Sequence, residues 1–340
     1  DGVPGLGAEA AVPLSLPAAA HYAPQPFVVN ADVNGDGHDD LLWTSGPTGA
    51  TTLRYRLGTA SGLGPEVDTR IATASTGVPF DHDGDGRADL LNLSSSNQWR
   101  VIPGTAGGLG APIVTGLSAG NYIDFRGVDF NGDGRGDLAW SEMVGHSQDI
   151  AVRVRYALPG GGFSSTPVTL YEQGMHTGYE WPEGGHFLGQ PGQRIDLDGD
   201  GREDLLMDER YSIARITAAG VTSDWFDGAF AGATPLDLNA DGCTDLVYLH
   251  YTGRWRARYS GCGSPYWAAP EVVGPAWSGS PLGQVLDWNG DGQGDLLLRG
   301  SGSWQVMTSA GDRLLPPANT GVPLGFPGGT VRADLNGDGL

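Results

Sequence analysis

The 340-residue sequence contains no lysine, so its 19 basic residues are all arginine and stand against 40 acidic residues. The formal net charge is −21, which argues against a nucleic-acid partner because such proteins need a basic surface. No apolar run is long enough to span a membrane, so we expect no membrane insertion. The chain also lacks an apolar periodicity of 3.6 residues, and it is rich in glycine, with 57 residues. This composition predicts short strands separated by turns.

Cysteine is equally scarce, with Cys243 and Cys262 as the two examples. We expect a hairpin that turns at Thr252–Gly253, with residue 251 opposite 254 and Cys243 opposite Cys262. Opposed residues on adjacent strands can reach disulfide distance, so we predict a disulfide, the alternative being two free thiols. A disulfide implies an oxidising compartment, and therefore a secreted or exported protein. Because the sequence begins with Asp1, we expect either a removed leader or a piece cut from a longer chain.

The most prominent feature of the sequence is an acidic loop of nine residues, first seen from Asp32 to Asp40. Its positions 1, 5 and 9 are Asp, position 3 is Asp or Asn, position 6 is Gly, and a leucine-rich segment follows. Further copies begin at Asp81, Asp129, Asp196, Asp237 and Asp287, and a copy beginning at Asp334 is cut off by the end of the sequence. A motif that returns at intervals of about 50 residues is typical of a repeat architecture.

Each repeat contains four short apolar segments, with the acidic loop between the first and the second. Four strands in about 50 residues predict one blade of an all-β propeller built from four-stranded antiparallel sheets. We expect a single domain over residues 1–340, with units starting near residues 26, 75, 123, 190, 231, 281 and 328. Seven loops favour seven blades, the last being incomplete or split between the termini. Six blades are the alternative.

One repeat carries an insertion at residues 171–190. Because strands alternate in direction, we expect this insertion on the face opposite the acidic loops. Insertions in repeat proteins often lie on a binding face, and the alternative is an ordinary surface loop. The side chains with possible ligand contacts are His176, Tyr179, Trp181 and His186.

The acidic loops offer oxygen ligands at alternate positions, as a hard cation requires, and Ca²⁺ takes six to eight oxygens. Mg²⁺ demands stricter octahedral geometry, so Ca²⁺ is the expected ion. An EF-hand is excluded because position 12 is Trp43 in the first loop rather than a bidentate Glu. Position 7 holds unlike residues, which fits a ligand role for the backbone carbonyl. We expect the Asp at position 9 both to bind the ion and to hold the start of the second strand.

These considerations predict about six calcium sites, with a structural rather than a catalytic role. The predicted ligands are Asp32, Asn34, Asp36, His38 and Asp40; Asp81, Asp83, Asp85, Arg87 and Asp89; Asp129, Asn131, Asp133, Arg135 and Asp137; Asp196, Asp198, Asp200, Arg202 and Asp204; Asp237, Asn239, Asp241, Cys243 and Asp245; and Asp287, Asn289, Asp291, Gln293 and Asp295. Asp334, Asn336 and Asp338 form an incomplete site.

The pattern Asp-x-Asp/Asn-x-Asp-Gly-x-x-Asp-Leu resembles the FG-GAP/VCBS-type repeats of calcium-binding β-propellers, such as the integrin α-subunit head. The Asp-Leu-Leu strands and the Trp-x-Val segments at Trp99 and Trp304 are more similar to the propeller region of bacterial Rhs-type and Tc-toxin B-component (SpvB-like) proteins. This resemblance implies a region of a large secreted or exported chain that docks to another component. The sequence departs from these families because it has no regular Phe-Gly partner and no tyrosine-rich Rhs repeats.

We therefore expect a non-enzymatic calcium-binding propeller that mediates protein interaction or adhesion. Its partner is a protein or a surface glycan, or another domain of a longer parent chain. The first alternative is a glycan-binding propeller that uses Tyr179 and Trp181 on the insertion. The second is a propeller polysaccharide lyase or hydrolase, although the sequence has no His-Glu-x-x-His motif.

Overall fold

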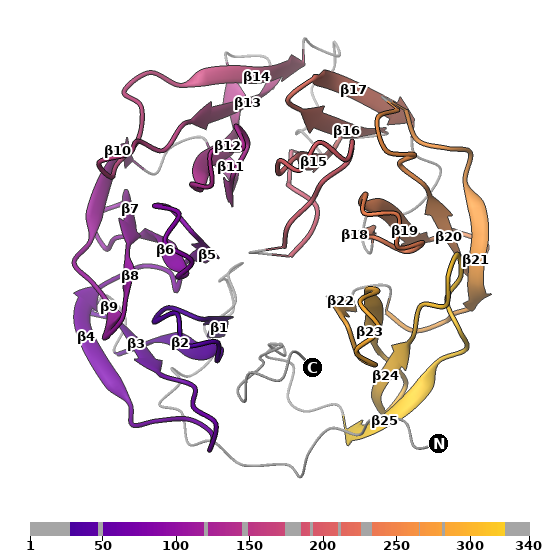
Figure 1. The fold of residues 1–340 in the computed structure, drawn as a ribbon, viewed down its shortest axis with the longest axis horizontal. Coiled ribbons are helices and arrows are strands. Elements are labelled where there is room, and N and C mark those ends of the chain that lie inside the picture. Colours follow the sequence, from indigo (N-terminus) through magenta and orange to yellow (C-terminus); the bar gives the residue numbers. More distant parts are fainter. Residues whose placement is uncertain are drawn as a thin grey trace.

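The computed structural model describes residues 28–46, 50–118, 122–144, 149–173, 185–190, 193–209, 212–225, 233–264, 266–280 and 283–323. These residues form strands and turns, and none of them belongs to a helix that could cross a membrane. The strands gather into sheets that stand in a ring around a common axis, as Figure 1 shows in a view along that axis.

The sheets follow one another in chain order. The first two contain β1 (Val28–Ala31), β2 (Asp40–Ser45), β3 (Thr52–Arg56) and β4 (Val67–Ala72), then β5 (Val78–Phe80), β6 (Asp89–Leu93), β7 (Gln98–Ile102) and β10 (Ile113–Ser118). The next two contain β11 (Tyr122–Val128), β12 (Asp137–Val144), β13 (Asp149–Arg155) and β14 (Val168–Gln173), then β15 (Leu205–Asp208), β16 (Ser212–Thr217) and β17 (Gly220–Trp225). The last two contain β18 (Thr234–Leu236), β19 (Asp245–Leu249), β20 (Arg254–Arg258) and β21 (Glu271–Ala276), then β22 (Gly283–Leu286), β23 (Asp295–Arg299), β24 (Ser303–Met307) and β25 (Ala318–Pro323). A small hairpin of β8 (Gly104–Thr105) and β9 (Gly108–Leu109) extends the second sheet's last connection.

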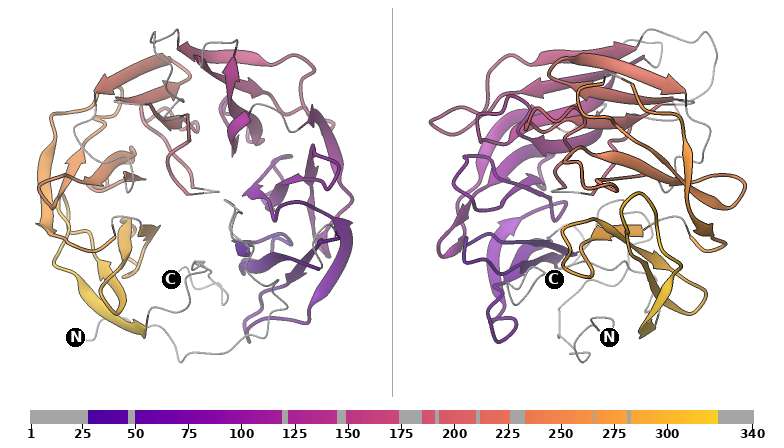
Figure 2. Two further views of the ribbon diagram at one scale, coloured as in Figure 1. Left: turned by 180° about the vertical axis from the view of Figure 1, so that it is seen from behind. Right: turned by 45° about the vertical axis from the view of Figure 1, so that its right-hand side comes forward.

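The described residues thus form a six-bladed propeller of antiparallel sheets, which confirms the all-β prediction. Within each complete blade the first strand lies innermost and the fourth outermost, as Figure 1 and the left view of Figure 2 show. In the fourth blade, Phe187 bridges Met207 at the place of a first strand. The preferred prediction of seven blades was therefore wrong, and the alternative of six blades is confirmed for the described residues. Counting loops overestimates the blades because an acidic loop needs only the first two strands, and the seventh loop lies outside the described residues.

Burial explains why inner and outer strands differ in sequence. In β6, the first four residues, Asp89 to Asn92, are buried, because this strand lies between neighbouring blades on both sides. In β4, half-buried and exposed residues alternate, which is typical of an edge strand with one face toward solvent. The apolar runs after each acidic loop are therefore strands buried on both faces.

The hydrophobic core lies between the blades rather than along the axis. Five clusters of buried side chains each combine residues from two consecutive blades. In one of them Leu42 and Tyr55 of the first blade meet Leu90 and Ile102 of the second. Each blade is therefore stabilised by its neighbours in sequence, as expected for repeat units that cannot bury their faces alone.

The hairpin of β19 and β20 has a different register from the predicted one. Leu249 pairs with Trp255, and the turn comprises residues 251–253, with Gly253 at φ 75°. The expected turn had two residues, so the prediction that 251 pairs with 254 was wrong by one position. A three-residue loop that ends in a left-handed glycine is a common hairpin connection. As a result, Cys243 and Cys262 lie beyond the ends of the paired segments rather than opposite each other within them.

Candidate metal centre

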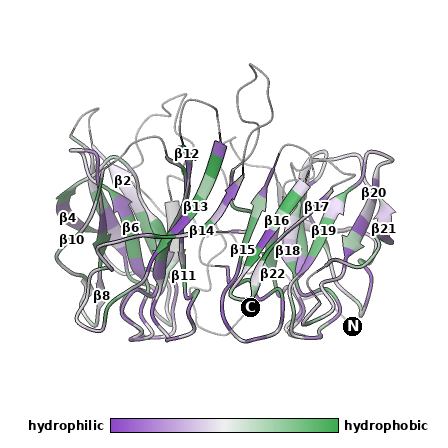
Figure 3. Cartoon of the chain, turned by 90° about the horizontal axis from the view of Figure 1, so that it is seen from above, coloured by the Kyte–Doolittle hydropathy of each residue, from purple (hydrophilic) through white to green (hydrophobic). Residues whose placement is uncertain are grey.

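Each of the six complete acidic loops leads directly into the second strand of its blade. In the first loop, Asp32 accepts hydrogen bonds from the amides of Gly35 (2.7 Å) and Gly37 (2.8 Å). The glycine at position 6 of every loop has φ between 81° and 89°, a region that L-residues rarely adopt. These contacts curl the backbone so that alternate side chains face one another. Figure 3 shows the strands that carry such loops running between the two faces of the ring.

The Asp at position 9 is the most buried acidic residue of each complete loop, with at most 3% of its surface exposed. Asp40 accepts one hydrogen bond from the amide of Val33 (2.9 Å) and another from the amide of Gly58 (2.8 Å). The first bond closes the loop on itself, and the second holds the connection between β3 and β4. Asp89, Asp245 and Asp295 make the same pair of bonds in their blades. The acidic loops and the connections between third and fourth strands therefore share one face.

Burial raises the pKa of these position-9 carboxyls, and the other carboxylates of the loop add to the effect. The pKa rises to about 6 for Asp40 and Asp245, to about 7 for Asp89 and Asp137, and to about 8 for Asp204. The pKa of Asp295 is raised as well. Backbone amides oppose the shift because they favour the ionised form. A cation placed among these groups would lower the same pKa values.

The donor set at positions 1, 3 and 5 fits a hard cation. In the second loop, Asp81, Asp83 and Asp85 bring carboxylate oxygens within 4.8 Å of one another, and Asp196, Asp198 and Asp204 do so in the fourth. In addition, Oδ1 of the buried Asp204 has no hydrogen-bond partner within the described structure. Oxygen-only ligands of this kind are those that Ca²⁺ prefers.

The loops fall into two kinds according to position 3. Where it is Asn, the amide donates to the position-5 carboxylate, as Asn34 does to Asp36 (3.0 Å). The same bond is present at Asn131, Asn239 and Asn289. The second and fourth loops have Asp83 and Asp198 instead, which cannot donate and which add a negative charge. These two loops therefore have the greatest electrostatic need for a cation.

Position 7 presents its backbone amide to the position-5 carboxylate, as His38 does to Asp36 (3.0 Å). The other five position-7 residues do the same. Their carbonyls as ion ligands stay a prediction. His186 lies beside the fourth blade, exposed, with its amide donating to Asp208 (2.6 Å). His176, Tyr179, Trp181 and the seventh-loop residues Asp334, Asn336 and Asp338 lie outside the described residues.

The structure also contains links between consecutive loops that were not predicted from sequence. The amide at position 8 of one loop donates to the position-1 carbonyl of the preceding loop, as Ala88 does to Asp32 (2.8 Å). Gly136, Glu203 and Thr244 continue this series to the fifth loop. Position 8 varies among Ala, Gly, Glu and Thr because this bond uses its backbone amide, so the sequence carries no signal for it. The side chains of Glu203 and Thr244 also accept a bond from the position-1 amide of the preceding loop.

A second link comes from the side chain at position 7. Arg87 pairs with Asp85 of its own loop and packs over Gly35, the position-4 glycine of the preceding loop. Arg135 and Arg202 also pair with an Asp of their own loop and pack in the same way over Gly84 and Gly132. We call such a position-7 residue a cover residue. It ties neighbouring blades together at the predicted metal loops.

Gly84→Ala is expected to destabilise the protein more than Gly86→Ala. Both glycines have positive φ (77° and 81°), so both variants have the cost of a left-handed L-residue, about 1–2 kcal/mol. A Cβ at Gly84 would also lie 2.5 Å from the carbonyl oxygen of Gly134, whereas one at Gly86 meets nothing within 4 Å. The additional loss should be about 1–3 kcal/mol in chemical denaturation. Equal losses would show that the loops do not need their close approach.

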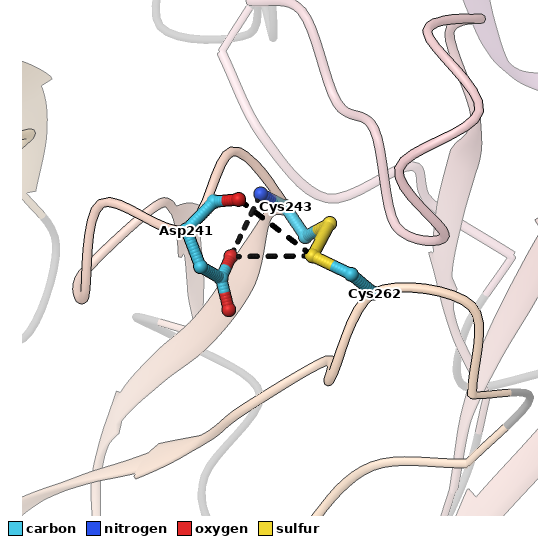
Figure 4. A group of neighbouring side chains, drawn as sticks. All are labelled: Asp241, Cys243 and Cys262. Carbon is cyan, nitrogen blue, oxygen red and sulfur yellow. Dashed lines mark hydrogen bonds between the residues drawn. A yellow bond between two sulfur atoms is a disulfide. The ribbon is translucent and has the colours of Figure 1, made fainter.

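Cys243 and Cys262 form a disulfide with a Cα–Cα distance of 5.7 Å. The bond joins the fifth acidic loop to the connection between β20 and β21, as Figure 4 shows. Asp241 lies against both cysteines, but their sulfurs are committed to each other and are not thiolate ligands for a metal.

Known proteins resemble this chain in sequence and in fold. A family model described as an FG-GAP-like repeat matches residues 32–92, which include the first two acidic loops. No curated protein matches the chain. Of solved structures, BBS1N in complex with ARL6DN has a TM-score of 0.50 at 11% identity, covering 89% of this chain and 84% of that one. A structure of the Photorhabdus luminescens Tc holotoxin pore has a TM-score of 0.47 at 19% identity and covers 83% of this chain. The present chain spans 14% of that toxin chain.

The fold defines the class: this protein is a β-propeller, and its residues 32–92 match an FG-GAP-like repeat. At 11% identity, the likeness to BBS1N establishes the fold alone. Such propellers serve in general as protein-interaction modules without catalysis, and the class is compatible with an extracellular or exported protein.

Proposed function

We propose that this protein is a calcium-stabilised, non-enzymatic propeller that acts as a protein-interaction or adhesion module within a larger exported bacterial protein. The observation that carries the proposal is the acidic loop repeated in six consecutive blades, in which the position-1 Asp curls the backbone in the same way each time. In the second loop this brings oxygens of positions 1, 3 and 5 within 4.8 Å of one another, and in the fourth loop oxygens of positions 1, 3 and 9. The formal charge of −21 adds support, because six divalent ions would reduce it to −9. The resemblance to Rhs-type and SpvB-like propellers supports the exported setting.

Calcium would be held by the side chains at positions 1, 3 and 5, with the position-7 carbonyl and the position-9 carboxylate completing the set. It would supply electrostatic cross-linking of the loops rather than a reactive centre. Extracellular calcium modules bind with Kd on the order of 10⁻⁴–10⁻³ M. At about 1 mM calcium, a site at the tight end adds about 1.4 kcal/mol to the free energy of unfolding.

Isothermal titration of the metal-depleted protein tests this proposal, with Asp83→Asn as the informative variant. Asn is the residue found at position 3 in four of the six complete loops, so the metal-free fold should be unchanged. The loss of one carboxylate should weaken calcium binding at the second loop by about tenfold, since each 1.4 kcal/mol corresponds to that factor. Wild-type protein should show calcium binding at several sites and a melting temperature that rises with calcium.

Two results would contradict the proposal. One is a wild-type protein that takes up no calcium and melts at the same temperature with and without it. The other is an Asp83→Asn variant that is already destabilised without calcium, because that would assign Asp83 a purely structural role. Asp39→Asn, at position 8 of the first loop and outside the predicted ligand set, serves as the control for loss of one negative charge.

A further inference from the structure

The contacts between the fourth and fifth acidic loops differ from those between the preceding loops. At the first three junctions an arginine is the cover residue. A Cβ built on Gly35 would lie 2.9 Å from Cγ of Arg87, and one on Gly132 would lie 2.9 Å from Cγ of Arg202. At the fourth junction, position 7 is Cys243, and no arginine side chain is available from that position.

The disulfide occupies the place of the missing arginine. A Cβ built on Gly199, the position-4 glycine of the fourth loop, would lie 2.9 Å from Sγ of Cys243. It would also lie 3.5 Å from Cβ and 3.7 Å from Sγ of Cys262. Both halves of the disulfide therefore cover the fourth loop.

The same disulfide contacts the fifth loop. Sγ of Cys262 lies 3.5 Å from Oδ1 of Asp241, and the amide of Cys243 donates to that oxygen (2.9 Å), as Figure 4 shows. The adjacent residue Thr244 exchanges two hydrogen bonds with Asp196, at 2.6 and 3.0 Å. Asp196 and Asp241 are predicted ligands of the fourth and fifth loops, so the disulfide belongs to the fifth loop and lies against the fourth.

We propose that the Cys243–Cys262 disulfide makes cation binding by the fourth and fifth loops dependent on redox state. This inference rests on the proposed calcium function. The fourth loop gathers the carboxylates of Asp196, Asp198 and Asp204, which repel one another. The disulfide fixes Cys243 of the fifth loop where it packs against Gly199 of the fourth, so the oxidised protein has less conformational freedom to lose when the ion binds.

The disulfide is accessible from one side, because Cys262 is exposed while Cys243 is buried. A dithiol reductant attacks Sγ of Cys262 and releases the Cys243 thiolate, which takes up a proton. The second thiol of the reductant then attacks the reductant sulfur that is bonded to Cys262. This releases the Cys262 thiolate, which takes up a proton. The protein gains two electrons and two protons, and the dithiol is oxidised to a cyclic disulfide.

Calcium titrations of the oxidised and the dithiothreitol-reduced protein test the inference. Reduction should weaken two sites by about tenfold and leave the others unchanged. The double variant Cys243→Ser, Cys262→Ser should behave as the reduced protein and ignore the reductant. The double variant Cys243→Arg, Cys262→Ser restores the arginine cover of the other junctions, so it should bind as the oxidised wild type in both conditions.

Circular dichroism of each form below its melting temperature verifies that binding is compared between folded proteins. Identical titrations of oxidised and reduced wild type would overturn the redox inference while leaving calcium binding in place. If the arginine variant binds calcium as weakly as the serine variant, then an arginine at position 7 does not replace the disulfide over Gly199, and the inference that the two cover residues act alike is wrong. Absence of calcium binding in every form would instead overturn the proposed function.

Discussion

Asp89→Ala is expected to cost about 2–6 kcal/mol in the free energy of unfolding, even without calcium. The carboxylate is 1% exposed and accepts hydrogen bonds from the amides of His82 (2.8 Å) and Gly104 (2.6 Å). Its removal leaves two buried amides without acceptors, and each such group costs about 1–3 kcal/mol. It also detaches the acidic loop from the connection that follows β7. Urea denaturation in chelator measures the loss.

Asp204→Ala is the matched control for this prediction. Asp204 occupies the same position in the fourth loop and is 3% exposed, but Oδ2 accepts a bond from Leu197 (2.7 Å) while Oδ1 has no partner within the described structure. Its replacement should cost about half as much without calcium. A loss below about 1 kcal/mol at Asp89, or equal losses at both positions, would contradict the role of the position-9 carboxylate in holding the loop and the following connection together.

Removal of calcium is expected to destabilise the protein much more at pH 8 than at pH 5. In the folded protein the pKa of Asp89 is raised to about 7 and that of Asp204 to about 8, against about 3.9 in an unfolded chain. Folding therefore takes up protons between these values. The stability that these groups contribute is fully present below about pH 4 and is lost as the pH rises through 6 to 8.

The pKa shift of His82 changes stability with pH in the opposite direction. Burial lowers the pKa of His82, so its contribution is present above its usual range and is lost as the pH falls. Against this one group stand the six position-9 aspartates, and the pKa values of Asp208 and Glu203 are raised as well, so the net stability of the metal-free protein should fall from pH 5 to pH 8. Each unit of pKa difference corresponds to about 1.4 kcal/mol, which places the total at several kcal/mol. Calcium needs ionised ligands, so its stabilisation should grow over the same interval.

Melting curves of resin-depleted protein at pH 5, 6.5 and 8, with and without 1 mM calcium, measure this effect. Sodium chloride at equal ionic strength controls for simple screening of the negative charge. Depletion on a chelating resin is preferable to added chelator, whose own affinity for calcium falls at low pH. A metal-free protein that becomes more stable between pH 5 and pH 8 would contradict the prediction.

The strands and the loops were predictable because their causes are local. A left-handed glycine at position 6 and short acidic side chains at positions 1, 3 and 5 determine the curl of each loop. The clamp at position 9 was anticipated at Asp40, although the partner amide of Gly58 was not. The hairpin register near Cys243 was missed because it depends on whether Gly253 ends a three-residue turn.

By itself, the sequence determined the repeat, the four-stranded unit, the oxygen-rich loops and the pairing of Cys243 with Cys262, since each follows from residues near one another in a unit. The tertiary structure alone decided that the described blades number six and that the first five loops are joined in series. Those joints use backbone amides such as that of Ala88, and glycines such as Gly199 that leave room for a neighbour. Backbone groups are common to all residues, so contacts between blades leave little trace in the sequence until the blades are packed together.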